Sequence, residues 1–405
     1  ITSYFGVDAA SVNWFANVFL ISLASTILVV GVVADWVGRE RLFVSGVFLF
    51  MISSLLILFT RDFTTALVLR ALQGLGSAMI SGIAVAILAS LFPRETGFVI
   101  GINTAAVYVG TTLGPVLGGF LVNYTGWSSI FLFTGSVALA SSVLALLSLD
   151  LGKKRSGKKP RFETLALFTI SLIMISTGSA YIKSLSSVSS LLAGLALFTA
   201  TLYIEYRGSI NLVKQIFERR VFLAYLVALL NYLATFALSI LYSNYLQLRL
   251  GLTPLQTGLV LVAQPLPQVI LSPLAGYLAD KWEPGILVTI GMALISLGIG
   301  LSIATYKWLS LLIISLVLIG AGFAFFASPN TTQIVRRIPR EAYASATSFL
   351  GLMRFLGQSL STSILTSVIT LLKDPAPMKT SLTIYLAASI AGLLMAIASI
   401  QKRSN

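Results

Sequence analysis

The chain has 405 residues, of which 57% are hydrophobic and only 10% are charged, and its mean hydropathy is +0.95. Water-soluble domains carry about 25% charged residues, so this composition excludes a soluble fold. The sequence contains neither cysteine nor histidine, which excludes disulfides, soft-metal sites, thiol nucleophiles and imidazole proton relays, and with them most enzyme chemistry. The net charge of +14 does not indicate nucleic-acid binding, because the basic residues alternate with apolar runs and form no patch.

Apolar runs of about 20 residues recur along the chain, and this is the length that an α-helix needs to cross a bilayer. The runs are apolar on all sides, whereas the strands of a membrane barrel would alternate. The sequence therefore predicts an all-α polytopic membrane protein. We expect thirteen spans, at residues 13–34, 41–60, 64–92, 96–122, 127–149, 164–182, 186–205, 221–246, 255–279, 285–305, 308–330, 342–372 and 380–400.

The loop charges predict the orientation of these spans. Most lysines and arginines fall on one set of alternate loops, which by the positive-inside bias is cytoplasmic together with the C-terminus. The chain begins at the foot of a helix without Met or a signal peptide, so we expect that its first span is missing. The run from Gly152 to Arg161 is interpreted as a cytoplasmic linker, with binding of anionic lipid headgroups as the alternative. The opposite side carries Arg61, Lys183, Arg249, Lys307, Lys373 and Lys379.

Two short segments recur at nearly one offset. Gly31-Val-Val-Ala-Asp35 returns as Gly276-Tyr-Leu-Ala-Asp280, 245 residues later, and Pro93-Arg94-Glu95 returns as Pro339-Arg340-Glu341. Because both pairs occupy matching positions between spans, we interpret the chain as a duplicated helical bundle with an inserted helix pair. The expected domains are 1–150, an N-terminal bundle; 151–206, the linker and inserted pair; and 207–405, a C-terminal bundle.

The first motif, residues 31–41, joins two spans by a short polar turn. Gly31 permits close helix approach, Asp35 can accept hydrogen bonds from a helix N-terminus or from Arg39, and Gly38 allows a tight turn. The loop continues with Glu40 and Arg41.

The second motif places charge inside a span. Arg70 and Gln73 share one face of a helix, followed by Gly74. A charge within the membrane is a functional hypothesis because it costs several kcal/mol there, and the alternative is a structural arginine bonded to backbone carbonyls.

The third motif is a glycine series on the span expected at 96–122, the fourth of the thirteen and the fifth when the missing first span is counted. Its regular spacing predicts a flat, close-packing face, while Pro115 frees a carbonyl and bends the helix. A role in packing alone is the alternative. The series comprises Gly101, Gly110, Gly114, Pro115, Gly118 and Gly119.

The fourth motif runs from Tyr245 through Gln247, Gly251 and Pro254 to Gly258, and Gln264-Pro265 follows it. Together the four motifs resemble the major facilitator superfamily, and specifically its fourteen-span drug/proton antiporter branch. The resemblance covers the whole chain and also includes Asn13-Trp14 and the segment from Gly351 through Arg354 to Gln358.

The resemblance implies a role for each motif. The loop at 31–41 would latch the cytoplasmic gate, Arg70 would take part in proton transfer, and the glycine series would mark an exporter. Polar groups facing a midplane cavity would bind the substrate, although each could be a satisfied packing group. These candidates are Asn17, Arg70, Gln73, Tyr232, Tyr245, Gln247, Gln264, Arg354 and Gln358.

One departure from the family concerns its acidic residues. Family members carry an acid on their first span, whereas every acid in this sequence falls in a loop or at a span end. Arg70 and Arg354 therefore have no carboxylate beside them within the spans. This favours an anionic or neutral substrate, and we expect that the chain without a first span shows no proton-coupled efflux.

We therefore expect a proton-coupled exporter of hydrophobic or amphipathic molecules that works by alternating access in the plasma membrane of a prokaryote. The partners would be the substrate, protons and the bilayer, with the protein a monomer that binds no nucleic acid, cofactor or metal. The alternatives are a proton-coupled symporter, an exporter of organic anions or lipids, and a transport-inactive scaffold. A membrane enzyme is disfavoured because no polar cluster gathers at one membrane face.

Overall fold

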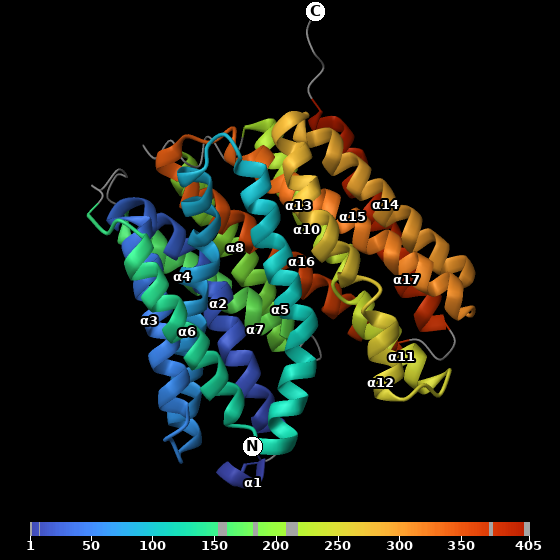
Figure 1. The fold of residues 1–405 in the computed structure, drawn as a ribbon, viewed down its shortest axis with the longest axis horizontal. Helices are drawn as coiled ribbons and strands as arrows, with labels where there is room; N and C mark the ends of the chain where they lie inside the picture. Colours follow the sequence, from blue (N-terminus) through green and yellow to red (C-terminus); the bar gives the residue numbers. More distant parts are fainter. Residues whose placement is uncertain are drawn as a thin grey trace, which may run out of the picture. The chain divides into compact units, whose positions relative to one another are not determined.

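The computed structural model describes residues 2–7, 9–152, 160–180, 185–207, 218–371 and 376–400, and every regular element in these ranges is helical (Figure 1). The predicted all-α architecture is confirmed. In chain order the elements are α1 (Thr2–Phe5), α2 (Ala9–Val37), α3 (Arg39–Ile57), α4 (Phe63–Leu91), α5 (Thr96–Thr125), α6 (Ser129–Ser148), α7 (Phe162–Ala180), α8 (Leu185–Arg207), α10 (Arg219–Thr235), α11 (Leu238–Leu248), α12 (Pro254–Leu261), α13 (Pro265–Lys281), α14 (Pro284–Thr305), α15 (Leu309–Val335), the 3₁₀ turn η1 (Arg340–Ala342), α16 (Tyr343–Leu371) and α17 (Ala376–Ser399).

Each predicted span falls on a helix, and two of them are broken. The span predicted at 255–279 is divided into α12 and α13, and Pro265 begins the second piece because proline lacks the N–H that would continue a helix. The span at 221–246 is divided into α10 and α11, where the N–H of Ala237 donates to Ser361 Oγ at 3.0 Å. This side-chain acceptor replaces the helical partner, as a low-dielectric environment requires.

Ten stretches of the described chain are long and apolar enough to cross a membrane. In the described residues, α7 and α8 contain shorter apolar stretches, 162–178 and 189–204. The 29-residue α16 is long enough but is not among the ten, because serine, threonine, Arg354 and Gln358 lower its hydropathy. The central part of the predicted basic linker, 153–159, lies outside the described residues.

The contacts divide the chain into two compact units. Unit 1 comprises 1–87, 113–214 and 339–352, and unit 2 comprises 88–112, 215–338 and 353–405. The division differs from a simple split along the sequence, because α5 and α16 each contribute their N-terminal part to one unit and the remainder to the other. The inserted pair α7 and α8 belongs to unit 1, where α7 packs against both α8 and α2.

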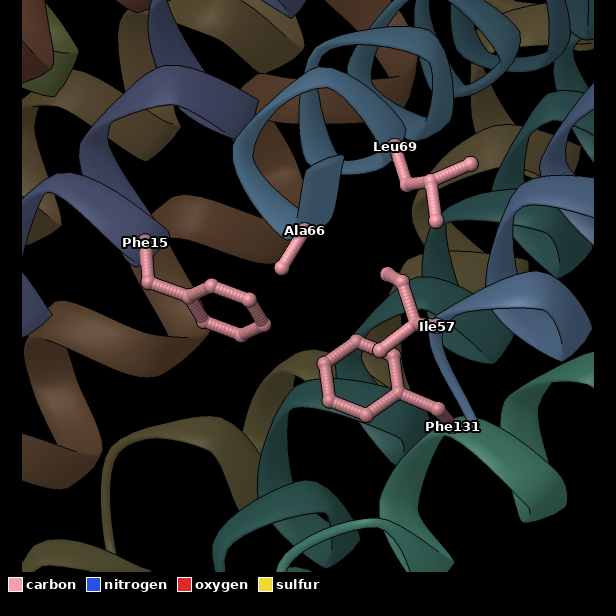
Figure 2. Packing of buried hydrophobic residues seen from close by; sticks show 5 residues of the cluster. All are labelled: Phe15, Ile57, Ala66, Leu69 and Phe131. Carbon is pink, nitrogen blue, oxygen red and sulfur yellow. The ribbon is translucent and has the colours of Figure 1, made fainter. Parts of the chain in front are cut away.

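A cluster of buried apolar side chains holds four helices of unit 1 together (Figure 2). Phe15 of α2 and Phe131 of α6 meet edge to face with ring centroids 5.7 Å apart, and Ile57 of α3 is fully buried beside them. Such pairs stabilise beyond the area that they bury. Ala66 and Leu69 of α4 complete the cluster.

In unit 2, α14 packs along α15 and α17, as Figure 1 shows. The contact between α14 and α15 depends on glycine, because a Cβ on Gly291 would lie 2.6 Å from the carbonyl oxygen of Gly322. Small residues at such positions let backbones approach closely, which is how helices associate where lipid provides no hydrophobic drive.

Replacing Phe131 by Ala should lower the free energy of unfolding by about 3–5 kcal/mol, because the substitution empties the centre of the unit 1 cluster. Denaturant unfolding of the purified protein in detergent measures this. Leu147→Ala on the same helix is the matched control, since Leu147 is 80% exposed. A loss of the same size in the control would show that the cluster has no special weight.

Candidate functional site

The carboxylate of Asp35 lies at the beginning of α16, within unit 1. It accepts hydrogen bonds from the backbone N–H of Ala344 (3.2 Å) and of Ser345 (2.8 Å) and from the Ser345 hydroxyl (2.6 Å). The first N–H groups of a helix have no partner in their own helix and carry the positive end of its dipole. The Asp35 carboxylate accepts from these N–H groups and places a negative charge at the positive end of the dipole, as the sequence predicts for an acid at this position.

Arg39 and two glycines support this contact. Arg39 donates from Nε and Nη2 to Asp35 Oδ1 at 2.9 and 2.7 Å, and Nη2 also donates to the Arg340 carbonyl oxygen. Gly38 joins α2 to α3 with φ +120°, a conformation that L side chains rarely adopt. A Cβ on Gly31 would lie 2.6 Å from the Ala344 carbonyl oxygen, so glycine is required where α2 meets α16.

Asp280 makes the corresponding contact in unit 2. Its carboxylate accepts from the backbone N–H groups of Gly97 (2.7 Å) and Phe98 (2.8 Å) at the beginning of α5, and from Arg336 Nη2 at 2.8 Å. Gly276 stands four residues before it, as Gly31 does before Asp35, and a Cβ there would overlap the Gly97 carbonyl oxygen.

The two capped helix ends show that the sequence repeat extends to local structure. An acid of the first half caps α16 of the second half, and an acid of the second half caps α5 of the first. The two sites differ in their cation, since Arg39 lies four residues after its acid while Arg336 is 56 residues from Asp280, and Asp35 also accepts from the Ser345 hydroxyl.

Arg70 lies in α4 among aromatic rings of unit 1. Its guanidinium carbon is 4.6 Å from the ring centroid of Phe19, 5.1 Å from that of Phe15 and 5.7 Å from that of Phe131. Nε donates to the Phe15 carbonyl oxygen at 2.8 Å, and Nη1 donates to Gln73 Oε1 at 2.6 Å. The arginine is thus stabilised by a carbonyl, an amide and π-faces, and none of its partners among the described residues is a carboxylate.

Arg70 and Gln73 line a cavity of about 620 Å³ within unit 1. Apart from these two residues and Thr134 its walls are apolar and largely aromatic, and Arg70 is the one ionisable group among the lining residues. A small number of polar groups in an aromatic wall is typical of sites for small organic molecules. The lining residues are Val12, Phe15, Phe19, Phe50, Arg70, Gln73, Val122, Trp127, Ile130, Phe131 and Thr134.

In unit 2 the structure brings Arg354 and Tyr232 together. The guanidinium carbon lies 5.8 Å from the Tyr232 ring centroid, and Nη2 donates to Thr331 Oγ1 at 2.9 Å. Phe323 packs edge to face on Tyr232 at 5.3 Å and on Tyr108 at 5.5 Å. The buried Nε of Arg354 has no hydrogen-bond partner in the described part of the chain.

The other predicted cavity residues are not among the lining residues of the Arg70 cavity. Tyr245 packs edge to face on Tyr306 at 5.2 Å, and the exposed Gln247 donates to Ser243 of its own helix. Gln264 lies at the break before α13, while Asn17 and Gln358 are half-buried in α2 and α16. Their role in substrate binding stays a prediction.

The glycine series of α5 is divided between two environments. Gly101 packs tightly, because a Cβ there would lie 3.0 Å from Pro273 Cα and overlap the Ser272 carbonyl oxygen. No heavy atom of the described chain lies within 4 Å of a Cβ added at Gly110, Gly114, Gly118 or Gly119. The close packing expected of the whole series is therefore seen at its beginning only.

The family is decided by comparison with known proteins. The sequence model of the Major Facilitator Superfamily matches residues 1–218 and 224–403. The chain belongs to this superfamily. It is a multi-span membrane transporter and not an enzyme.

Similar proteins include members with different printed roles. Riboflavin transporter RibZ of Clostridioides difficile (strain 630) is 27% identical over 91% of this chain and 82% of its own. Multidrug resistance protein Stp of Mycobacterium tuberculosis (strain ATCC 25618 / H37Rv) is 26% identical over 90% of this chain and 70% of its own. The crystal structure of a bacterial homologue of the iron transporter ferroportin has a TM-score of 0.69 at 16% identity, covering 98% of this chain and 92% of the other, which supports the superfamily fold.

The sequence did not predict two features of this superfamily member: the aromatic wall of the Arg70 cavity and the cap that Asp280 makes. The aromatic wall around Arg70 was not predicted, because Phe15, Phe19 and Trp127 look like any other apolar residues of a span. Asp280 was recognised as a repeat of Asp35 but not as a site residue, although the shared offset was the signal that could have placed it there.

Asp35→Asn or Asp280→Asn should each lower the free energy of unfolding by about 1–3 kcal/mol, since an uncharged amide is a weaker partner for the helix end. Denaturant unfolding in detergent measures both. The control is Asp62→Asn, because Asp62 caps α4 through Thr65 (N–H to Oδ2, 2.6 Å) but is exposed. The Thr65 N–H holds the pKa of the Asp62 carboxyl below its usual range. Because this carboxyl is exposed, Asp62→Asn should change the free energy of unfolding by an amount close to undetectable. Equal effects at all three positions would contradict a special role for the caps made by Asp35 and Asp280.

Gly276→Ala should lower the free energy of unfolding by about 1–3 kcal/mol, because the added methyl meets backbone atoms of Gly97 that cannot turn aside. Gly118→Ala is the matched control in a helix, and its methyl enters open space. We expect the control to be neutral or stabilising by up to about 1 kcal/mol, because alanine favours helix. Thermal unfolding of the two proteins under one condition gives the comparison, and a stable Gly276→Ala protein would show that α13 and α5 are not held in close contact.

Proposed function

We propose that this transporter belongs to the fourteen-span drug/proton antiporter branch and exports hydrophobic or amphipathic small molecules by alternating access. The observation that carries the proposal is the cavity around Arg70, where a charged group of a span meets an aromatic wall. The relative named as a multidrug resistance protein and the motif from Tyr245 to Gly258 support the branch.

The cavity favours substrates with extended apolar or aromatic surface. Five of its lining residues carry aromatic rings, and rings can stack on planar molecules with little loss of side-chain entropy. Arg70 and Gln73 already bond to each other, so a substrate acceptor would compete for donors on Arg70. Specificity of this kind is broad, as export of varied compounds requires.

The electrostatics of the cavity favour a neutral or anionic substrate. Among the described lining residues no carboxylate balances Arg70, and a cationic substrate would meet an uncompensated like charge. A cation would gain from ring faces, but Arg70 itself already lies over the rings of Phe15, Phe19 and Phe131.

The open glycine face of α5 supports a cycle with more than one packing state. A Cβ added at Gly110, Gly114, Gly118 or Gly119 would meet no atom of another described helix within 4 Å, although glycine in a helix costs about 1 kcal/mol relative to alanine. We interpret this face as a surface that another helix reaches in a different state of transport.

Proton-coupled uptake is the second candidate. One relative is named as a riboflavin transporter, a name that gives no direction, and a planar heteroaromatic molecule would match the aromatic wall around Arg70 in uptake as well as in export. The two functions differ in the direction of net substrate movement under an imposed pH gradient, which one vesicle experiment measures.

In vesicles that contain the intact protein, a pH gradient should drive export of a neutral or anionic dye such as fluorescein, and Arg70→Ala should abolish it. The lost charge removes both the hydrogen bond to Gln73 and the cation that attracts the substrate. Dye fluorescence with and without the gradient is the readout.

Arg61→Ala is the matched control, because Arg61 is an exposed arginine just before α4, and it should transport like the unmodified protein. Gradient-independent dye movement would overturn proton coupling. Preferential export of ethidium over fluorescein would overturn the assigned substrate charge, and accumulation against the expected direction would favour uptake.

A further inference from the structure

A larger cavity, of about 730 Å³, lies within unit 2 where α13 ends and α14 begins. The ends of α15 and α17 complete it, so four helices meet around a polar space at one end of the unit. It shares no lining residue with the Arg70 cavity and does not include Arg354. The lining residues are Asp280, Lys281, Trp282, Glu283, Pro284, Ile286, Gln333, Arg336, Arg337 and Ile400.

The charged groups of this cavity leave an excess of positive charge. Asp280 is already engaged by two backbone N–H groups and by Arg336, and Glu283 Oε1 pairs with Arg337 at 3.1 Å. Lys281 Nζ lies 4.3 Å from the ring centroid of Tyr277, and among the described residues no carboxylate is paired with it. Three cations against two bound acids favour an anionic ligand.

A buried amide and a helix end also face this space. Gln333 is only 2% exposed, its Oε1 has no partner in the described chain, and its Nε2 is 3.5 Å from Ser399 Oγ. The Oε1 atom lies 3.5 Å from the position of a Cβ added to Gly285, in the first turn of α14. Glu283 precedes that helix without making a side-chain cap, so the positive end of the α14 dipole opens into the cavity.

Apolar surface leads away from the cavity along two helices. Ile270, Leu274 and Tyr277 form an exposed stripe on α13, and Ile286 and Ile290 form another on α14. Trp282 at the rim is 54% exposed, and tryptophan at such a position is typical of the membrane interface. A soluble phosphate compound would gain nothing from these stripes, whereas acyl chains would lie along them.

The geometry points to a binding site for an anionic phospholipid, with its phosphodiester held by Lys281, Arg336, Arg337 and the Gln333 Nε2 donor, whose contact with Ser399 Oγ is long at 3.5 Å. Guanidinium groups suit phosphate because they offer several N–H donors in one plane, and basic pockets at the membrane surface bind anionic headgroups. Acyl chains follow the stripes on α13 and α14. The site is independent of the transported substrate.

Native mass spectrometry of the delipidated full chain, titrated with phosphatidylglycerol and separately with phosphatidylcholine, tests this site. We expect preference for phosphatidylglycerol, and about a tenfold weaker affinity in a protein with Lys281→Gln and Arg337→Gln together. A matched control with Arg94→Gln and Arg219→Gln loses the same charge at exposed positions outside the cavity and should bind like wild type.

Gln333→Met separates a ligand-binding amide from a structural one. Removing a buried polar atom without a partner should leave the protein as stable or more stable, while phosphatidylglycerol binding weakens several-fold. Unchanged lipid affinity in this variant and in the double variant would overturn the proposal. Equal losses in the matched control would do the same, because they would indicate general charge attraction.

Two further measurements on the folded chain complete the test. Brominated phosphatidylglycerol should quench tryptophan fluorescence more than brominated phosphatidylcholine, and Trp282→Phe should remove the difference. Equal quenching by the two lipids would overturn the site. Glycerol 3-phosphate should not displace the lipid at equal concentration, and displacement would assign the cavity to a soluble phosphate compound instead.

Discussion

The structure depends on a carboxylate placed at the N-terminus of a helix where water is scarce. The unpaired N–H groups of the first helical turn are expensive to bury, and a carboxylate removes that cost while its own charge is stabilised by the helix dipole. Asp35 does this for α16 and Asp280 for α5. The glycines four residues before each acid are part of the same arrangement, because a side chain there would hold the helices too far apart for the hydrogen bonds to form.

The two membrane arginines show a different solution to the same problem of burying charge. Arg70 has the faces of Phe15 and Phe19 and the carbonyl of Phe15, and Arg354 has the ring of Tyr232 and the hydroxyl of Thr331. Neutral partners stabilise a cation without cancelling it. A positive potential therefore remains in each unit, available to an anion or to a dipole that reaches it.

The sequence predicted the helices well because membrane crossing imposes length and composition together. It also predicted the cap at Asp35, since the acid, the glycines and the basic residue stand at fixed spacing. It did not predict the aromatic surroundings of Arg70, because Phe15 and Phe131 come together only when α2 and α6 pack and no local pattern records that contact. The breaks within the spans at 221–246 and 255–279 were missed because an apolar run looks the same whether or not its helix is continuous.

The polar composition of α16 has a consequence for biogenesis. For a segment with Arg354, Gln358 and many hydroxyl side chains, transfer of the isolated helix from the translocation channel into lipid releases little free energy, because each of these polar groups needs a hydrogen-bond partner there. Two of its hydrogen-bond partners belong to helices that are synthesised before it. Thr347 donates to the Gly82 carbonyl oxygen of α4, and Arg354 donates to Thr331 of α15. We therefore expect membrane insertion of α16 to be coupled to the earlier helices α4 and α15, so that this late helix enters the bilayer as part of a folding step.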